Sequence, residues 1–240
     1  MLGEQPRTEE SAKRVRVVFA GTVVADTARP LLVWENPYYP AYYLPREDVR
    51  TELFVPSGRT RASQLGEGAL STLRAGGREA VDAVVEYPEA PLAGYVRLDW
   101  PAMDQWFEED EQVYTHPRDP HKRVDILPSS RHVRIDVDGE PVAESRHPWL
   151  LFETGLPTRY YLPAPHVRLD RLTPSDTVTH CPYKGEAEYW SVGEHIDVAW
   201  SYRHPLPESQ RIAGLICFAD ERVDVRVDGV LQARPQTPWS

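Results

Sequence analysis

The residue types best suited to chemistry gather in one segment of the chain, from His180 to Trp190. It reads His-Cys-Pro-Tyr-Lys-Gly and continues to a Tyr-Trp pair. A glycine directly after Lys184 predicts a sharp turn that presents the ammonium group. A lysine desolvated among aromatic rings has a lowered pKa and can act as a nucleophile, a base or an anion-binding group. The alternative interpretation of Lys184 is a solvent-exposed turn residue.

Further side chains extend this cluster. Glu153 can pair with the lysine or orient a ligand, and Cys181 is either a reactive thiol or a small buried apolar residue. Trp200 and Tyr202 alternate along the chain, so they form either a pocket wall or the core of a strand. The candidate ligand-binding residues are Glu153, Tyr160, Tyr161, Cys181, Tyr183, Lys184, Gly185, Tyr189, Trp190, Trp200 and Tyr202.

No metal and no cofactor is expected at these residues. His180, His195, Asp197 and His204 can bind metals, but their spacing matches no zinc or iron motif. The sequence contains no phosphate-binding glycine loop, no dinucleotide fingerprint and no Gly-x-Ser-x-Gly motif. The ligand is therefore expected to be a planar or anionic small molecule that the side chains bind directly.

The chain is organised as a tandem duplication. Residues 15–45 align without a gap on residues 133–163, a shift of 118 positions. Gly21 falls on Gly139, and the Tyr-Tyr-Leu-Pro run at 42–45 falls on the same run at 160–163. Aromatic pairs, prolines and glycines do not stay in step over such a length by chance, so the two halves are copies of one domain.

The two copies differ most at the Lys184 segment. At the same register the first copy has residues 62–70, where the cysteine, tyrosines, lysine and tryptophan are missing. The comparison suggests that the second copy carries the site and that the first, from Ser63 to Leu70, has lost it and supports the second.

Local patterns favour β structure. Val133, Ile135 and Val137 alternate with polar residues, and Asp138-Gly139 then predicts a tight hairpin turn. One short helix is predicted over 101–109, because apolar residues recur there at helical spacing. The predicted domains are a first repeat at 15–113, a linker at 114–130 and a second repeat at 131–240. The second repeat ends in an extra hairpin, since Val223 to Pro238-Trp239 resembles the start of a further copy.

Composition narrows the class of protein. The chain has 240 residues, 41% of them hydrophobic, and no apolar run long enough to cross a bilayer or to form a signal peptide. A formal net charge of −10 argues against a general nucleic-acid binder. Cys181 and Cys217, the two cysteines, form no redox or zinc motif. We expect a cytoplasmic protein that binds neither nucleic acid nor membrane.

The motifs of the second copy resemble those of a bacterial family, domain of unknown function 427. The resemblance is carried by Cys-Pro-Tyr-Lys-Gly at 181–185, Tyr-Trp at 189–190, Tyr-Tyr-Leu-Pro at 160–163 and Ile-Ala-Gly at 212–214. The first copy resembles the same family with its middle motif eroded. The resemblance implies two β-tent-like domains, a fold shared with the ligand-binding domain of cereblon and with methionine sulfoxide reductase B. Those proteins hold zinc on paired cysteines, which this sequence lacks.

Three functions remain open at this point. The first is a small-molecule binding module with its pocket in the second repeat. The second is an enzyme that uses Lys184, Tyr183 or Cys181. The third is an interaction module that docks a protein partner through Pro-Tyr-rich loops such as residues 37–40.

Overall fold

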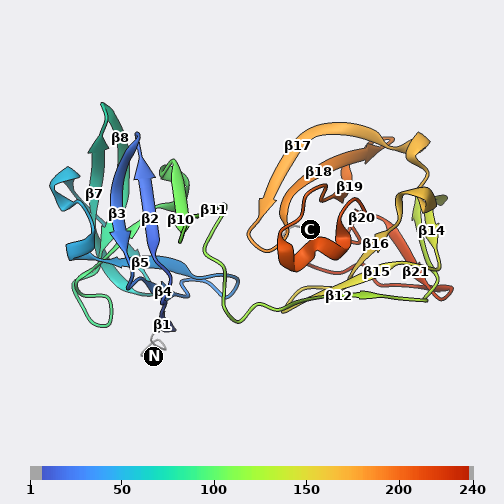
Figure 1. The fold of residues 1–240 in the computed structure, drawn as a ribbon, viewed down its shortest axis with the longest axis horizontal. Coiled ribbons are helices and arrows are strands. Elements are labelled where there is room, and N and C mark those ends of the chain that lie inside the picture. The colour runs from blue at the N-terminus through green and yellow to red at the C-terminus, as the bar shows by residue number, and fades with distance from the viewer. Residues whose placement is uncertain (1–6, 238–240) are drawn as a thin grey trace. The chain divides into compact units, whose positions relative to one another are not determined.

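The computed structural model describes residues 7–237. They form two compact units, one extending to Asp119 and one starting at Pro120 (Figure 1). Each unit holds one seven-stranded and one four-stranded antiparallel sheet. The chain is mainly β with two tandem domains, as the sequence predicts.

In the first unit the large sheet has the order β1-β4-β5-β9-β8-β7-β6, and the small sheet has the order β11-β10-β2-β3. The strands are β1 (Thr8–Glu10), β2 (Val15–Phe19), β3 (Thr22–Thr27), β4 (Leu31–Val33), β5 (Ala41–Pro45), β6 (Phe54–Ser63), β7 (Gly66–Ala75), β8 (Arg78–Glu86), β9 (Tyr95–Leu98), β10 (Gln105–Glu108) and β11 (Glu111–Val113). The short 3-10 helices are η1 (Arg46–Asp48), η2 (Thr51–Leu53) and η3 (Trp100–Ala102).

The second unit repeats this topology, with a large sheet β12-β15-β16-β20-β19-β18-β17 and a small sheet β14-β13-β21-β22. The strands are β12 (Val124–Pro128), β13 (Val133–Val137), β14 (Glu140–Ser145), β15 (Trp149–Glu153), β16 (Arg159–Leu162), β17 (Thr173–Cys181), β18 (Gly185–Val192), β19 (His195–Ser201), β20 (Ile216–Phe218), β21 (Asp224–Val227) and β22 (Val230–Leu231). The 3-10 helices are η4 (Ala164–His166), η5 (Leu169–Arg171) and η6 (Pro207–Ile212).

The large sheet of the second unit is buried on both faces. One face packs on the small sheet around Ile135, Leu162, Ala199 and Phe218. The opposite face carries a second apolar cluster that includes Tyr161 and Ile212 of η6. Side chains alternate between the faces of a strand, so neighbours in the sequence are divided between the two clusters.

The predicted hairpin turn at Asp138-Gly139 is confirmed. Both residues have positive φ, 51° and 80°, and they join β13 to β14. Aspartate tolerates this conformation and glycine adopts it freely, which is why this pair specifies a tight turn whose twist matches the strands.

The predicted helix over 101–109 is wrong. Residues 100–102 form one 3-10 turn, η3, and the chain then continues as strand β10. In that strand Trp106 and Glu108 are buried while Phe107 is only partly buried, a period of two rather than of 3.6. The apolar residues at helical spacing belong to a turn and a strand that pack on β2.

The C-terminal hairpin is not the start of a third copy. β21 pairs with β13 just as β10 pairs with β2, so the hairpin β21–β22 is the regular end of the second domain. The Pro238-Trp239 part of that prediction lies outside the described residues. The predicted linker, 114–130, contains β12, which pairs with β15 and belongs to the large sheet of the second unit.

No helix in residues 7–237 has the length and apolar character needed to cross a membrane.

Candidate functional site

The turn between β17 and β18 positions Lys184. Gly185 adopts φ of +98°, and the Lys184 amide donates to the Cys181 carbonyl over 3.3 Å. Leu206 and η6 then hold the turn from outside, because the Leu206 amide donates to the Lys184 carbonyl and the Ser209 hydroxyl donates to the Tyr183 carbonyl. The turn is sharp, as expected, but it is packed against the protein.

Lys184 is not a solvent-exposed turn residue. Its Nζ lies 2.5 Å from Oε2 of Glu153, and the two side chains are only 12% and 7% exposed. Burial disfavours the ammonium, but Cys181 and Glu153 outweigh it and raise the pKa of Lys184 above its ordinary value. The lowered pKa expected from the sequence is therefore wrong: this lysine stays charged because it has a carboxylate partner.

Five of the other candidate residues lie on the same face of the large sheet. Tyr161 and Tyr202 are buried there, with Cys181, Tyr189 and Trp200 partly buried against them. The Trp200 indole N–H donates to the Tyr161 hydroxyl over 3.2 Å, and the Tyr189 and Trp200 rings are 6.4 Å apart. Burial raises the pKa of both Tyr161 and Tyr202 well above its ordinary value, so neither phenol acts as a base.

Tyr160 and Trp190 do not join this group. Each neighbours a residue of the cluster in the sequence but points to the opposite face, where both pack against the core between the two sheets. Strand alternation forbids a single cage that contains both members of Tyr160-Tyr161 or of Tyr189-Trp190. Tyr183 is buried at the turn, 6% exposed.

The first unit has a polar cluster of its own at the equivalent place. Glu35 accepts hydrogen bonds from Tyr43 (2.8 Å) and from Arg97 (2.6 Å). The strand pairing makes Tyr43 equivalent to Tyr161 and Arg97 equivalent to Cys217. Both units therefore neutralise a carboxylate, the first with an arginine on a strand and the second with a lysine on a turn.

The two thiols differ in access. Cys217 is fully buried, and burial raises the pKa of its thiol well above the ordinary value, whereas Cys181 is partly exposed and both are free. A thiolate is the reacting form, so we expect a disulfide reagent to label Cys181 in the native chain and Cys217 only after unfolding. Mass spectrometry of the labelled peptides checks this, and equal native labelling would contradict the burial.

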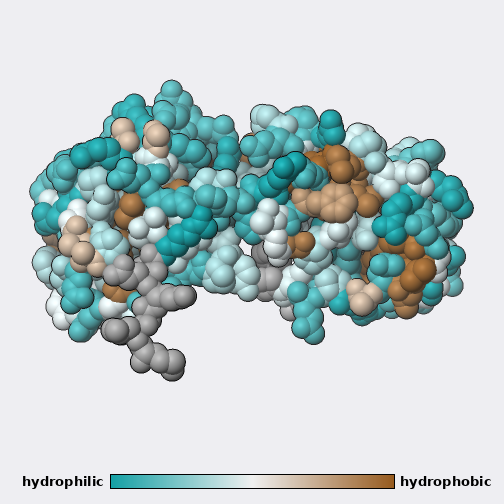
Figure 2. Space-filling view, turned by 90° about the horizontal axis from the view of Figure 1, so that it is seen from below, coloured by the Kyte–Doolittle hydropathy of each residue, from teal (hydrophilic) through white to brown (hydrophobic). Residues whose placement is uncertain are grey.

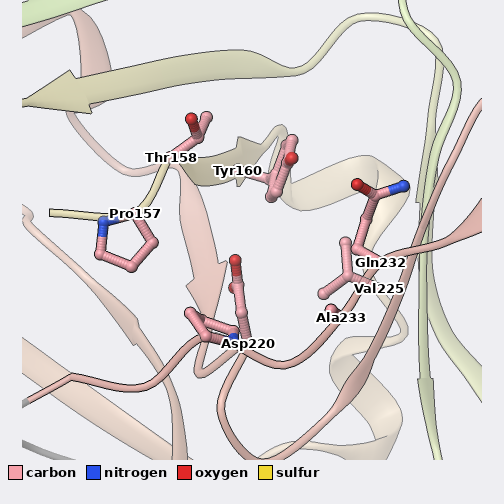
Figure 3. A pocket seen from close by; sticks show the side chains of 8 residues that line it. Pro157, Thr158, Tyr160, Asp220, Val225, Gln232 and Ala233 are labelled. Atoms are coloured by element: carbon pink, nitrogen blue, oxygen red, sulfur yellow. The ribbon is translucent and has the colours of Figure 1, made fainter.

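The second unit also contains a hollow of about 160 Å³ on the side of the sheet that carries Tyr160. Its lining residues are Pro157, Thr158, Tyr160, Asp220, Val225, Gln232, Ala233 and Pro235. Figure 3 shows the Asp220 carboxyl group pointing into the space between Thr158, Tyr160 and Gln232. We call this space the Asp220 hollow.

Asp220 has an unusual electrostatic setting. Burial raises its pKa to about 7, against the opposing effect of Arg159. Arg159 gives both of its terminal nitrogens to Glu221, at 2.9 and 2.6 Å, and lies 3.6 Å from Asp220. Two carboxyl groups thus share one guanidinium, which already binds Glu221 in a bidentate manner.

The same place in the first unit is filled by two tryptophans. Trp106 pairs with Val17 as Val225 pairs with Ile135, so Trp106 is equivalent to Val225. Trp100 is likewise equivalent to Asp220, because both come two residues after matching positions of the strands β9 and β20. The Trp100 and Trp106 rings are stacked 4.4 Å apart, and the Trp106 ring lies 6.4 Å from Tyr42, the counterpart of Tyr160.

Sequence reasoning found Tyr160 but missed Asp220, Val225 and Gln232. The sequence contains a signal for them, since the two copies also differ at two equivalent positions: Trp100 and Trp106 of the first copy correspond to Asp220 and Val225 of the second. The predicted helix over 101–109 and the predicted third copy over 223–239 hide this signal, because they place two equivalent segments in unlike elements.

Residues 7–109 and residues 125–229 each match the domain of unknown function, DUF427. The chain belongs to the DUF427 family. It is a tandem DUF427 protein whose two matched segments fall in the two structural units. A comparison with curated proteins finds no match.

Within residues 7–237 of this DUF427 protein, no three histidine, cysteine or acidic side chains gather as a metal site.

Proposed function

We propose that the second unit of this DUF427 protein is a small-molecule binding module and that a planar ligand binds in the Asp220 hollow. One observation carries the proposal: the stacked pair Trp100–Trp106 of the first unit is replaced by Asp220 and Val225, and space remains. The hollow opens to solvent and combines the carboxyl group of Asp220 with the flat ring of Tyr160, the mixture of polar and apolar groups that small-molecule sites use.

The size of the hollow limits the ligand. Sites for drug-sized molecules measure roughly 300 Å³ or more, whereas this one measures about 160 Å³. A ligand of one or two fused rings matches it. A more open hollow of about 330 Å³ lies at Pro141, Glu144, His166 and Arg168, but its charged residues Glu144 and Arg168 are exposed.

The state of Lys184 supports binding over the enzyme alternative. An ammonium that is paired with Glu153 and whose pKa is raised is not available as a base or a nucleophile. We interpret the pair as a structural connection between the β17–β18 turn and β15. The remaining candidates Tyr189 and Trp200 extend the apolar cluster of that face.

We further propose that the two sheets of each unit are arranged as in a β-tent fold and that the protein is located in the cytoplasm of a bacterium. The free, partly exposed Cys181 supports the setting, because accessible thiols persist in reducing compartments.

Filling the hollow tests the proposal. Val225→Trp introduces the residue that the first unit has at this position, and Ala233→Phe fills the same space from the exposed C-terminal segment without touching the core. We expect either change to lower the affinity for a small planar probe such as indole by at least about tenfold, since the probe and the new ring compete for one volume. Binding to the full chain is measured by NMR titration.

Val230→Trp is the matched control. Val230 lies on β22 of the same hairpin and is 64% exposed, so a ring there leaves the hollow open. Indole affinity should stay at the wild-type value in this variant. The proposal is wrong if indole and related bicyclic compounds fail to bind the wild-type chain, or bind it and the filled variants alike.

A further inference from the structure

We infer that the ligand of the Asp220 hollow is a planar heteroaromatic base and that Asp220 binds its donor edge. By donor edge we mean a ring N–H next to an amino group, as in cyclic amidines and guanidines. The inference rests on the proposed function and names the chemical class of its ligand. Three features of the two units carry it.

The first feature is the shape that the fold accepts at this place. In the first unit the Trp106 ring lies parallel to Trp100, with an interplanar angle of 4°, and is stacked at 21° to Tyr42. The second unit keeps the tyrosine as Tyr160 and loses both indoles. A flat ring system of indole size therefore restores the packing that the first unit has.

The second feature is the position of a hydrogen-bond acceptor. In the first unit the Trp106 indole N–H donates to the Trp100 carbonyl over 3.3 Å. Asp220 occupies the position of Trp100, and its carboxyl group points into the hollow (Figure 3). A ring N–H has an acceptor in both units, and only the second has acceptors for an additional amino group.

The third feature is the charge balance. Asp220 and Glu221 lie against the single guanidinium of Arg159, and Glu221 takes both of its terminal nitrogens. Asp220 is 7% exposed, so little of its surface contacts water. A buried carboxyl group without a full counter-charge is stabilised by a cation that also donates hydrogen bonds. An amidinium or guanidinium edge provides two parallel N–H groups, the arrangement that binds a carboxylate in a bidentate manner.

Three bicyclic probes of nearly equal shape separate these features. 2-Aminobenzimidazole has the donor edge of a cyclic guanidine, indole has one N–H, and benzofuran has none. We expect the wild-type chain to bind 2-aminobenzimidazole at least about tenfold more tightly than indole, and indole more tightly than benzofuran, because charge-assisted hydrogen bonds are about twice as strong as neutral ones. Calorimetric titration of the full chain at neutral pH measures the three affinities.

Asp220→Asn tests the residue. The amide has the size of the carboxyl group and keeps the hollow, but it presents a donor to the guanidine edge. We expect the preference for 2-aminobenzimidazole over indole to disappear while indole still binds, which also shows that the variant is folded. Asp224→Asn is the control: its carboxylate pairs with Arg234 on the surface, and the wild-type preference should remain.

The outcomes separate the inference from the proposed function. Equal binding of all three probes, or an unchanged preference in Asp220→Asn, overturns the assigned ligand class and leaves the hollow as a binding site. Failure of every probe to bind the wild-type chain overturns both.

Discussion

Replacing Lys184 by methionine is expected to destabilise the second unit by about 3–5 kcal/mol, the range for removing one partner of a buried ion pair. The substitution keeps most of the unbranched apolar side chain but leaves the Glu153 carboxylate, 7% exposed, without its cation. A urea titration followed by hydrogen exchange, read separately for peptides of each unit, measures the loss. The first unit is the internal reference, because each unit has its own core.

Two variants control this experiment. Adding Glu153→Gln to Lys184→Met should regain most of the lost stability, since no charge is then buried alone. Lys122→Met removes a partly exposed lysine whose Nζ donates to the Thr154 carbonyl, and a surface change of this kind stays within about 0.5 kcal/mol. A small effect of Lys184→Met, or a double variant as weak as the single one, would rule out the buried pair as the connection between the turn and β15.

The pair also explains why the two copies differ in sequence at the turn. The carboxylate of Glu35, which follows β4, and that of Glu153, which ends β15, each need a cation, and the first unit supplies Arg97 from a strand of the large sheet. The second unit has Cys217 at that position and supplies Lys184 from the turn. The first copy lacks the lysine because a different residue, Arg97, balances the charge of its carboxylate. The apparent loss of the motif at the turn is therefore one of two linked changes, the other being arginine in place of cysteine on the strand.

The parts of the fold that the sequence predicts are those with local signals. The turn at Asp138-Gly139 requires positive φ at both residues, and the alternation of Val133, Ile135 and Val137 requires a half-buried strand. The tandem organisation follows from the repeat itself. None of these depends on knowing which strands lie side by side.

The parts that fail depend on partners distant in the chain. Residues 105–108 form a strand because they pair with β2, about 90 residues earlier in the chain. The spacing of Met103 and Trp106 does not indicate this pairing. The sequence allows the pairing of Lys184 with Glu153 as one option, but it does not indicate that the pair is buried. The separation of Tyr189 from Trp190, in contrast, follows from strand alternation and was available from the sequence alone.

The stability of the second unit is expected to fall as the pH rises from about 5 to about 7, and Asp220→Asn is expected to remove that fall. Burial raises the pKa of Asp220 to about 7, from 3.8 as its ordinary value. Between the two values the folded state holds a proton that the unfolded state has released, so the free energy of unfolding decreases with rising pH. About three pKa units at roughly 1.4 kcal/mol each set the full effect at roughly 4 kcal/mol, of which roughly 2 kcal/mol falls between pH 5 and pH 7.

Other titrating groups do not obscure this result. Arg131 lowers the pKa of Asp228, and such carboxylates contribute stability that is complete above about pH 5 and lost only as the pH falls further. Groups that are the same in wild type and variant contribute equally to both urea titrations, so they cancel in the difference between the two. Asp224→Asn, which removes an exposed carboxylate paired with Arg234, should keep the wild-type slope.

The sign of the slope distinguishes two roles for Asp220. A carboxylate whose main partner is Arg159 would have a lowered pKa, and stability would then rise with pH up to about 4 and stay level to pH 7. A stability that falls between pH 5 and 7 means that Asp220 is protonated in the protein without ligand. The guanidinium of Arg159 does not stabilise its carboxylate sufficiently, because it is hydrogen-bonded to Glu221. A cationic ligand would then displace that proton, so saturation with 2-aminobenzimidazole should flatten the slope just as Asp220→Asn does.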